Sequence, residues 1–283
     1  MNDRTAATAE NLYVEANGVR YAYRRFGQGK GLPLLCLQHF TGTLDNWDPA
    51  IVDALAADRE IILFENAGVG GSSGDVPESI DGMVEHALRF VDAIGLKKFH
   101  ILGYSLGGFL AQNIALSRPD AVGRLIISGS APEGGPGAGM DRPELLAIYT
   151  DAQMPADEKL TRLFFPDTAS GREAAARFNA RLASRANDRD APNGAAVASA
   201  QLKAMIAWAG WKGDVREKLQ KISHPALVTN GSNDIMIPTD NTFTLARWLP
   251  DATLIIYPNA GHGALFQYPR EYVSHVRTFL GAG

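Results

Sequence analysis

The pentapeptide Gly103-Tyr104-Ser105-Leu106-Gly107 lies between an apolar, strand-like run, Lys98 to Leu102, and a helix-like segment, Leu106 to Ser117. It matches the pattern G-x-S-x-G. The pattern indicates a nucleophilic serine when a strand precedes it, a sharp turn carries the serine and a helix follows, as the sequence predicts here. Such a turn holds its serine in a strained backbone conformation, and the flanking glycines let strand and helix pass closely. We therefore expect Ser105 to be a nucleophile exposed at the carboxyl end of a strand.

A second segment, Gly70-Gly71-Ser72-Ser73-Gly74, matches the same pattern, so the pattern alone does not identify the nucleophile. This segment does not directly follow its nearest apolar run, Ile61 to Phe64, and it is followed by Asp75-Val76-Pro77 where a helix is required. We interpret it as a glycine-rich loop.

Composition narrows the class of protein and of partner. The 283 residues are 46% hydrophobic and 20% charged, which is ordinary for a globular protein that buries a sizeable core. The net charge of −4 gives no basic field that would indicate nucleic acid or an anionic membrane as partner. No apolar run approaches the length of a bilayer span, and the first ten residues lack the apolar segment of a secretory signal. We expect a cytoplasmic monomer or homodimer that acts on a small molecule.

Strand-like and helix-like segments alternate along most of the chain. Two β-rich runs joined by Asn17-Gly18 predict an opening hairpin. Four later runs are apolar on both faces, as in a parallel sheet covered on both sides: Leu34 to Leu37, Ile61 to Phe64, Phe99 to Leu102 and Leu125 to Ile127. Helices are predicted between these runs, at Pro49 to Ala57, Ile80 to Ile94 and Leu106 to Ser117. The alternation predicts an α/β fold with right-handed crossovers.

The alternation stops after Ser128, where a segment rich in glycine and proline begins. The chain is then rich in alanine and predicts four helices and no strand: Glu144 to Asp151, Ala156 to Phe165, Gly171 to Asn187 and Ala195 to Trp211. Strands resume at Ala226 to Thr229 and Thr253 to Tyr257, with helices at Asn241 to Trp248 and Arg270 to Leu280. We predict a core of residues 1–132 and 214–283 and a helical cap, or lid, of residues 133–213.

An acid and a histidine follow Ser105 in the order that a nucleophilic serine of this kind requires. Asp234 lies in the loop after the strand-like run Ala226 to Thr229, and His262 lies between the last strand and the last helix. We expect His262 to accept the Ser105 proton and Asp234 to orient the imidazole, forming a catalytic triad. The roles expected of the other histidines are structural, except for His39, whose role is open: His86, His100, His224 and His275.

Two backbone N–H groups are needed to stabilise the oxyanion, and the residue after the nucleophile, Leu106, supplies one. With these residues, the chain resembles the α/β-hydrolase superfamily over nearly its whole length. It is most similar to capped, single-domain serine hydrolases of the non-haem haloperoxidase-like and carboxylesterase-like kinds. The resemblance implies a mostly parallel, eight-stranded sheet with helices on both faces and an inserted helical lid. Where that family carries His-Gly, this chain has Gln38-His39, so the resemblance implies that Phe40 supplies the second N–H.

The resemblance also covers the segment from Phe64 to Ser72, which is similar to a structural loop of the family, Asp-x-Arg-Gly-x-Gly-x-Ser. Glu65 stands here in place of the aspartate, and Ala67 in place of the arginine. This supports the interpretation of the second serine pattern as a loop without a catalytic role.

Residues of a substrate pocket are predicted less directly. The candidates are His39, Tyr104, Phe164, Trp208 and Ile235. The cap carries no cluster of cationic residues that would bind a substrate carboxylate, and the sequence has neither a metal-ligand cluster nor a phosphate-binding loop. We expect no cofactor and no metal.

These observations predict a serine hydrolase that cleaves a small or medium-sized apolar ester or lactone through an acyl-enzyme. Two alternatives stay open. One is a ligand receptor or signalling partner that retains the triad. The other is a hydrolase or lyase that cleaves a carbon–carbon bond with the same three residues.

Overall fold

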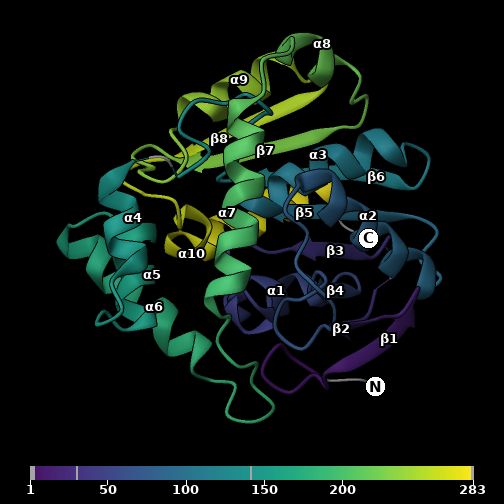
Figure 1. The fold of residues 1–283 in the computed structure, drawn as a ribbon, viewed down its shortest axis with the longest axis horizontal. Coiled ribbons are helices and arrows are strands. Elements are labelled where there is room, and N and C mark those ends of the chain that lie inside the picture. The colour runs from purple at the N-terminus through teal and green to yellow at the C-terminus, as the bar shows by residue number, and fades with distance from the viewer. Residues whose placement is uncertain (1–3, 30, 141, 282–283) are drawn as a thin grey trace.

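An eight-stranded sheet forms the centre of the computed structural model, which describes residues 4–29, 31–140 and 142–281 (Figure 1). The strands lie side by side in the order β1-β2-β4-β3-β5-β6-β7-β8. The first two strands pair antiparallel, and all pairs from β4 to β8 are parallel, which confirms the predicted fold class. The strands are β1 (Leu12–Ala16), β2 (Val19–Phe26), β3 (Leu34–Leu37), β4 (Ile61–Phe64), β5 (Phe99–Tyr104), β6 (Val122–Ser128), β7 (Ala226–Gly231) and β8 (Ala252–Tyr257).

The predicted hairpin and the central strands follow from local sequence. Asn17 and Gly18 both have positive φ, 49° and 78°, as a two-residue hairpin turn requires, and Ala16 pairs with Val19. Strands β3, β4 and β5 are buried on both faces, which explains why their sequences are continuously apolar. The strand order reverses between β3 and β5, so the loops after these two strands open a crevice at the carboxyl edge.

Helices cover both faces of the sheet outside residues 133–213. Pro49 is the first residue of α1, and the Asp48 carboxylate accepts a hydrogen bond from Ala50 N–H. Two short helices and a 3-10 turn were not predicted, because so few residues show no clear period. The elements are η1 (Leu44–Asn46), α1 (Pro49–Ala56), α2 (Ile80–Ala93), α3 (Leu106–Ser117), α8 (Val215–Gln220), α9 (Asp240–Trp248), α10 (Ala264–Gln267) and α11 (Pro269–Leu280). None of the helices in the described ranges is both long and apolar enough for a membrane crossing.

Residues 133–213 lie between β6 and β7 in the chain, and we call them the helical insertion; their described part contains four helices. They are α4 (Pro143–Thr150), α5 (Ala156–Phe164), α6 (Ala169–Leu182) and α7 (Ala195–Gly210). Figure 1 shows α4, α5 and α6 grouped at one side of the sheet, on the left of the view. Helix α6 ends at Leu182, earlier than the predicted Asn187. The Arg185 guanidinium donates hydrogen bonds to the carbonyls of Ala6, Ala7 and Ala9, so the chain leaves the helix axis here.

Candidate active site

Ser105 occupies the sharp turn between β5 and α3. Its φ of 55° and ψ of −119° are strained for a residue with a side chain. The turn depends on its glycines, because a Cβ at Gly103 would lie 2.3 Å from the Gly107 carbonyl oxygen, and one at Gly107 would lie 2.0 Å from Leu37 O. Strand β6 holds the strained residue: Ser105 N–H donates to Ser128 O at 2.9 Å.

Ser72, the serine of the second pattern match, has a structural environment. Its hydroxyl accepts a hydrogen bond from Ala22 N–H at 2.8 Å and donates one to Glu65 O at 2.9 Å. Both interactions are buried. The hydroxyl therefore ties the glycine-rich loop to β2 and has no base beside it.

Asp234 and His262 meet although they follow different strands. The His262 imidazole and the Asp234 carboxylate are joined by a 2.7 Å hydrogen bond between Nδ1 and Oδ2, with both side chains fully buried. The other carboxylate oxygen, Oδ1, accepts hydrogen bonds from Met236 N–H at 2.8 Å and Ile237 N–H at 3.0 Å. With Nδ1 donating to Asp234, the neutral ring carries its lone pair on Nε2. Among the described residues, Nε2 has no hydrogen-bond partner.

Two aromatic rings hold His262 in place. Tyr104 lies with its ring centroid 5.1 Å from that of His262 and donates a hydrogen bond from its hydroxyl to the His262 carbonyl at 3.3 Å. Phe164, from α5 of the insertion, lies 5.5 Å from the imidazole, and its carbonyl accepts a hydrogen bond from Gly263 N–H at 2.8 Å. Burial raises the pKa of Tyr104 well above its usual range, so this phenol stays neutral.

The loop after β3 forms a tight turn from His39 to Gly42, closed by a hydrogen bond from Gly42 N–H to His39 O at 3.0 Å. The N–H groups of His39 and Thr41 are bonded to the side-chain oxygens of Gln38 and Gln201. The N–H groups of Phe40 and Leu106 form no hydrogen bond with any part of the chain that the structure describes. These two donors are the ones that the sequence and its family resemblance predict.

His39 stabilises the same turn. Its Nδ1 lies 2.8 Å from the carbonyl oxygen of Phe40, so Nδ1–H donates and Nε2 carries the lone pair. Burial, opposed by the Phe40 hydrogen bond and assisted by the nearby His262, lowers the pKa of His39 to about 4. His39 is therefore neutral at pH 7.

A cavity of about 730 Å³ lies between the helical insertion and the carboxyl edge of the sheet. Ser105, His262, Phe40 and His39 belong to its walls. Most of the remaining lining near the insertion is apolar, from Leu146, Tyr149, Leu160, Leu163, Phe164, Ala198 and Leu202, with Met236 from the core. Other walls are polar and include Thr43, Asp45, Asn46, Arg189, Asp190 and Asn193.

The predicted pocket residues divide into two groups. His39 and Phe164 line the cavity, whereas Tyr104, Trp208 and Ile235 are not among its walls. Tyr104 is fully buried behind His262, and Trp208 stacks on Phe109 with ring centroids 5.0 Å apart. Ile235 is 41% exposed at the surface, and its neighbour Met236 lines the cavity instead. Sequence alone does not reveal which side of a helix or loop faces an internal space.

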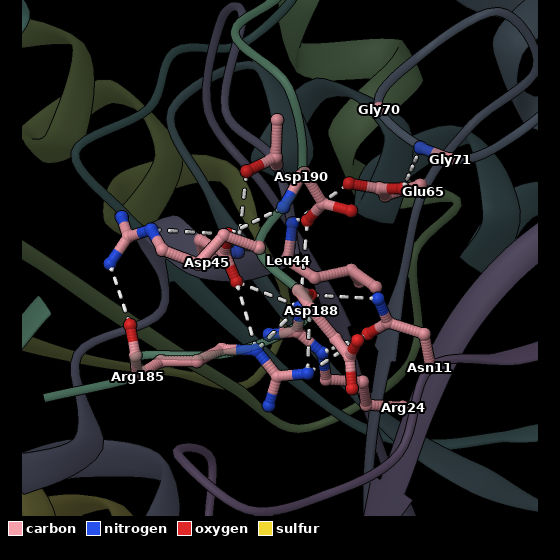
Figure 2. A network of polar contacts seen from close by, with 12 residues as sticks. Asn11, Arg24, Leu44, Asp45, Glu65, Gly70, Gly71, Arg185, Asp188 and Asp190 are labelled. Carbon is pink, nitrogen blue, oxygen red and sulfur yellow. Dashed lines mark hydrogen bonds and ion pairs between the residues drawn. The ribbon is translucent and has the colours of Figure 1, made fainter. Parts of the chain in front are cut away.

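A buried ionic network, which the sequence did not reveal, borders the polar part of the cavity (Figure 2). The Asp45 carboxylate accepts hydrogen bonds from Arg24 at 2.7 Å and from Asp190 N–H at 2.8 Å. The Glu65 carboxylate accepts hydrogen bonds from Leu44 N–H at 2.9 Å and Gly71 N–H at 2.8 Å. Burial, and next the charge of Asp190, raise the pKa of Glu65 to about 8. The network fastens the insertion to the loops after β3 and β4.

Within the described ranges, no three or more His, Cys, Asp or Glu side chains are grouped so that they could hold a metal ion. The two cations of the cavity walls are already engaged. Lys159 Nζ donates to Tyr149 O at 2.7 Å, and Arg189 donates to Leu182 O at 2.9 Å and Arg185 O at 3.1 Å. An ammonium has three N–H donors and a guanidinium five, so these bonds occupy only part of the donors of each side chain.

Comparisons with known proteins agree with the fold. The model of the family described as the alpha/beta hydrolase fold matches residues 33–269. A solved alpha/beta hydrolase fold protein from Chitinophaga pinensis is 40% identical, with a TM-score of 0.93 over 99% of this chain and 100% of its own.

Two of the curated proteins that are similar to this chain have names that describe different reactions. A pimeloyl-(acyl-carrier protein) methyl ester esterase from Aeromonas hydrophila subsp. hydrophila is 29% identical over 91% of this chain and 98% of its own. A 2-hydroxy-6-oxo-6-phenylhexa-2,4-dienoate hydrolase from Burkholderia cepacia is 28% identical over 86% of this chain and 84% of its own.

Proposed function

The chain belongs to the α/β-hydrolase fold family, and from this premise we propose that it is a cofactor-free serine hydrolase of small or medium-sized apolar esters or lactones. The observation that carries the proposal is the buried, 2.7 Å pair of Asp234 and His262 at the same cavity as the strained Ser105. A serine hydroxyl becomes an effective nucleophile only beside a base, and the base needs a third group to orient it.

In the first half-reaction, Ser105 Oγ attacks the substrate carbonyl carbon while His262 Nε2 takes the hydroxyl proton. The tetrahedral oxyanion accepts hydrogen bonds from the N–H groups of Phe40 and Leu106, at the positive end of α3. The intermediate collapses, the bond to the leaving oxygen breaks, and His262 returns its proton to that oxygen. The Asp234 carboxylate stabilises the imidazolium between these steps.

In the second half-reaction, water hydrolyses the acyl-enzyme. His262 Nε2 takes a proton from the water as it attacks the ester carbonyl. When the new intermediate collapses, the bond to Ser105 Oγ breaks and the proton passes to Ser105. The product is a carboxylic acid, and no cofactor enters either step.

The substrate class rests on the cavity. Its insertion side is lined by aliphatic and aromatic side chains, which favour an apolar acyl or alkyl group. Lys159 and Arg189 also belong to its walls and donate to backbone carbonyls, so the choice of an apolar substrate rests on the aliphatic and aromatic lining. We assign residues 133–213 as the cap of this pocket and residues 1–132 and 214–283 as the catalytic core.

The test combines labelling with kinetics. A fluorophosphonate probe should form a covalent adduct on Ser105, located by peptide mass spectrometry. A p-nitrophenyl butyrate assay should show a burst of p-nitrophenol, and Ser105→Ala should lower kcat by about 10⁴-fold or more. The matched control is Ser72→Ala, which removes the serine of the second pattern and should remain active and be labelled on Ser105 like the wild type. An adduct on Ser72, or full activity of Ser105→Ala, would contradict the proposal.

A second candidate, carbon–carbon bond hydrolysis, is favoured by the similarity to the Burkholderia cepacia dienoate hydrolase. A substrate panel separates the two. Esters and lactones of increasing chain length should be turned over, and a 2-hydroxy-6-oxo-dienoate should not. Turnover of the dienoate alone would replace the ester assignment, and tight ligand binding with negligible turnover of every substrate would favour a receptor.

A further inference from the structure

The backbone of the turn from His39 to Gly42 is strained at Thr41, whose φ is 56°. A turn with positive φ at its third position normally has glycine or asparagine there. Threonine is branched at Cβ, and branched residues rarely adopt this left-handed conformation. Without external contacts, rotation of the peptide between Phe40 and Thr41 would relieve the strain.

Two side chains of the helical insertion hold Thr41 from both sides of its backbone. Thr41 N–H donates a 2.6 Å hydrogen bond to Oε1 of Gln201, a residue of α7 that is only 4% exposed. The Thr41 carbonyl accepts a 2.9 Å hydrogen bond from Nδ2 of Asn193, in the segment before α7. Both partners are more than 150 residues away in sequence. The insertion therefore restrains the conformation of a core loop.

Packing around this turn is incomplete on one side, beside His39 and Gly42. A separate cavity of about 30 Å³ lies against it, with Gln38, Gly42, Leu106 and Gln201 among its walls. Such a space is large enough for a water molecule, so close packing does not surround the turn on every side. The hydrogen bonds to Gln201 and Asn193 hold the Thr41 end of the turn, and the bond from His39 Nδ1 to the Phe40 carbonyl holds its other end.

We propose that Gln201, assisted by Asn193, is a positioning residue that sets the oxyanion-binding N–H of Phe40 by holding Thr41 in its strained conformation. This inference rests on the proposed serine hydrolase function. Phe40 N–H is unpaired within the described part of the chain, while its neighbours at His39, Thr41 and Gly42 are bonded. Release of Thr41 would misplace this donor, which stabilises the transition state more than the ground state.

The test replaces Gln201 by methionine, which keeps the length of the side chain and removes the acceptor. Gln201→Met should lower kcat for p-nitrophenyl butyrate by about 10- to 100-fold while KM changes less than about threefold. Binding of a trifluoromethyl ketone, which forms a tetrahedral adduct, should weaken by a similar factor. Gln201→Glu retains an oxygen acceptor and should recover most of kcat. Hydrogen exchange should show lost protection of the Thr41 amide in Gln201→Met.

The most discriminating variant is Thr41→Gly, because glycine adopts positive φ without strain. In the Thr41→Gly background, Gln201→Met should cost less than about threefold in kcat, since the turn no longer needs the clamp. The control Met205→Leu changes another buried residue of α7 and should leave kcat unchanged.

Three results would overturn the inference: wild-type kcat in Gln201→Met, an effect on KM alone, or an equal loss of kcat in the Thr41→Gly background. Ser105→Ala is measured in the same assay. An inactive Ser105→Ala with a fully active Gln201→Met would overturn the positioning role only, whereas an active Ser105→Ala would overturn both proposals.

Discussion

At the scale of single residues, each of the two loops that meet at the cavity contains a residue with a strained backbone. Ser105 and Thr41 both have positive φ without being glycine, and each is held by hydrogen bonds from outside its own loop. Thr41 is the β-branched member of the described non-glycine residues with positive φ. Strain of this kind persists only where surrounding contacts impose it, and it is common at functional sites.

Asp234→Asn tests the orientation of the base at this scale. The amide keeps the size of the side chain, but it cannot favour the His262 tautomer that donates from Nδ1, and it does not stabilise the imidazolium. We expect kcat to fall by about 10⁴-fold with little change in thermal stability, measured by ester hydrolysis and calorimetry. A loss smaller than tenfold would show that Asp234 does not act through His262. Asp240→Asn, a change in the first turn of α9, is the control.

Glu65→Gln tests the buried network of Figure 2 through the pH dependence of stability. Burial raises the pKa of Glu65 to about 8 from an ordinary value of 4.5. The folded state thus favours the protonated carboxyl, and this contribution is present below pH 4.5 and lost as pH rises through 8. We expect Tm to decline from pH 6 to pH 9 in the wild type.

In Glu65→Gln, the absolute Tm should fall because one acceptor is lost, but its decline with pH should be smaller. Thermal unfolding at several pH values measures both. Glu15→Gln, a change at an exposed glutamate, should keep the wild-type slope. An unchanged slope in Glu65→Gln would mean that Glu65 is already ionised across this range.

At the scale of elements, Asp48 links two helices of different parts of the chain. It caps α1 through Ala50 N–H, and it accepts two hydrogen bonds from Arg181 of α6, at 2.7 and 2.6 Å. The Asp48 side chain is fully buried, whereas that of Arg181 is 25% exposed. The pair therefore fixes where α6 docks on the core.

Arg181→Met should destabilise the protein by about 3 kcal/mol, because it leaves the Asp48 carboxylate buried without its charged partner. Urea unfolding at pH 7 gives this value. The matched control is Arg177→Met in the same helix, which removes an exposed pair with Glu173 and should cost less than about 0.5 kcal/mol. Equal effects of the two variants would show that the buried pair has no special role.

At the scale of the whole molecule, the insertion and the sheet enclose the cavity together. Helices α4, α5 and α7 supply most of its apolar lining, and the loops after β3, β5 and β8 bring the proposed oxyanion donors, nucleophile and base to its walls. We therefore expect substrate size to depend on residues that are remote in sequence from Ser105.

Ala198→Phe should narrow this cavity, since Ala198 of α7 is one of its walls. We expect kcat/KM for long acyl esters to fall by about tenfold or more, with acetyl and butyryl esters much less affected. A chain-length series of p-nitrophenyl esters measures the shift. Ala196→Phe, at an exposed position of the same helix, should leave the series unchanged. An unaltered preference in Ala198→Phe would place the acyl group elsewhere.

The sequence by itself was sufficient to predict the strands of the sheet and most of the helices. It also identified Ser105, Asp234 and His262 as the candidate triad, each in a turn or loop directly after a strand. Continuous apolar runs, glycines at close approaches and loops directly after strands are signals contained within a few residues. The candidate donors Phe40 and Leu106 followed from the same signals together with the family resemblance.

Only the tertiary structure decided which residues surround these groups. Trp208 and Ile235 were predicted to line the pocket, but their helix and loop present Ala198 and Met236 instead. The contacts of Gln201 with Thr41 and of Asp190 with the network around Glu65 join segments more than 100 residues apart. The physical reason is that the spacing of apolar residues along a helix identifies its apolar face, but not the residues that this face contacts. Those contacts depend on how the helices, strands and loops pack against one another.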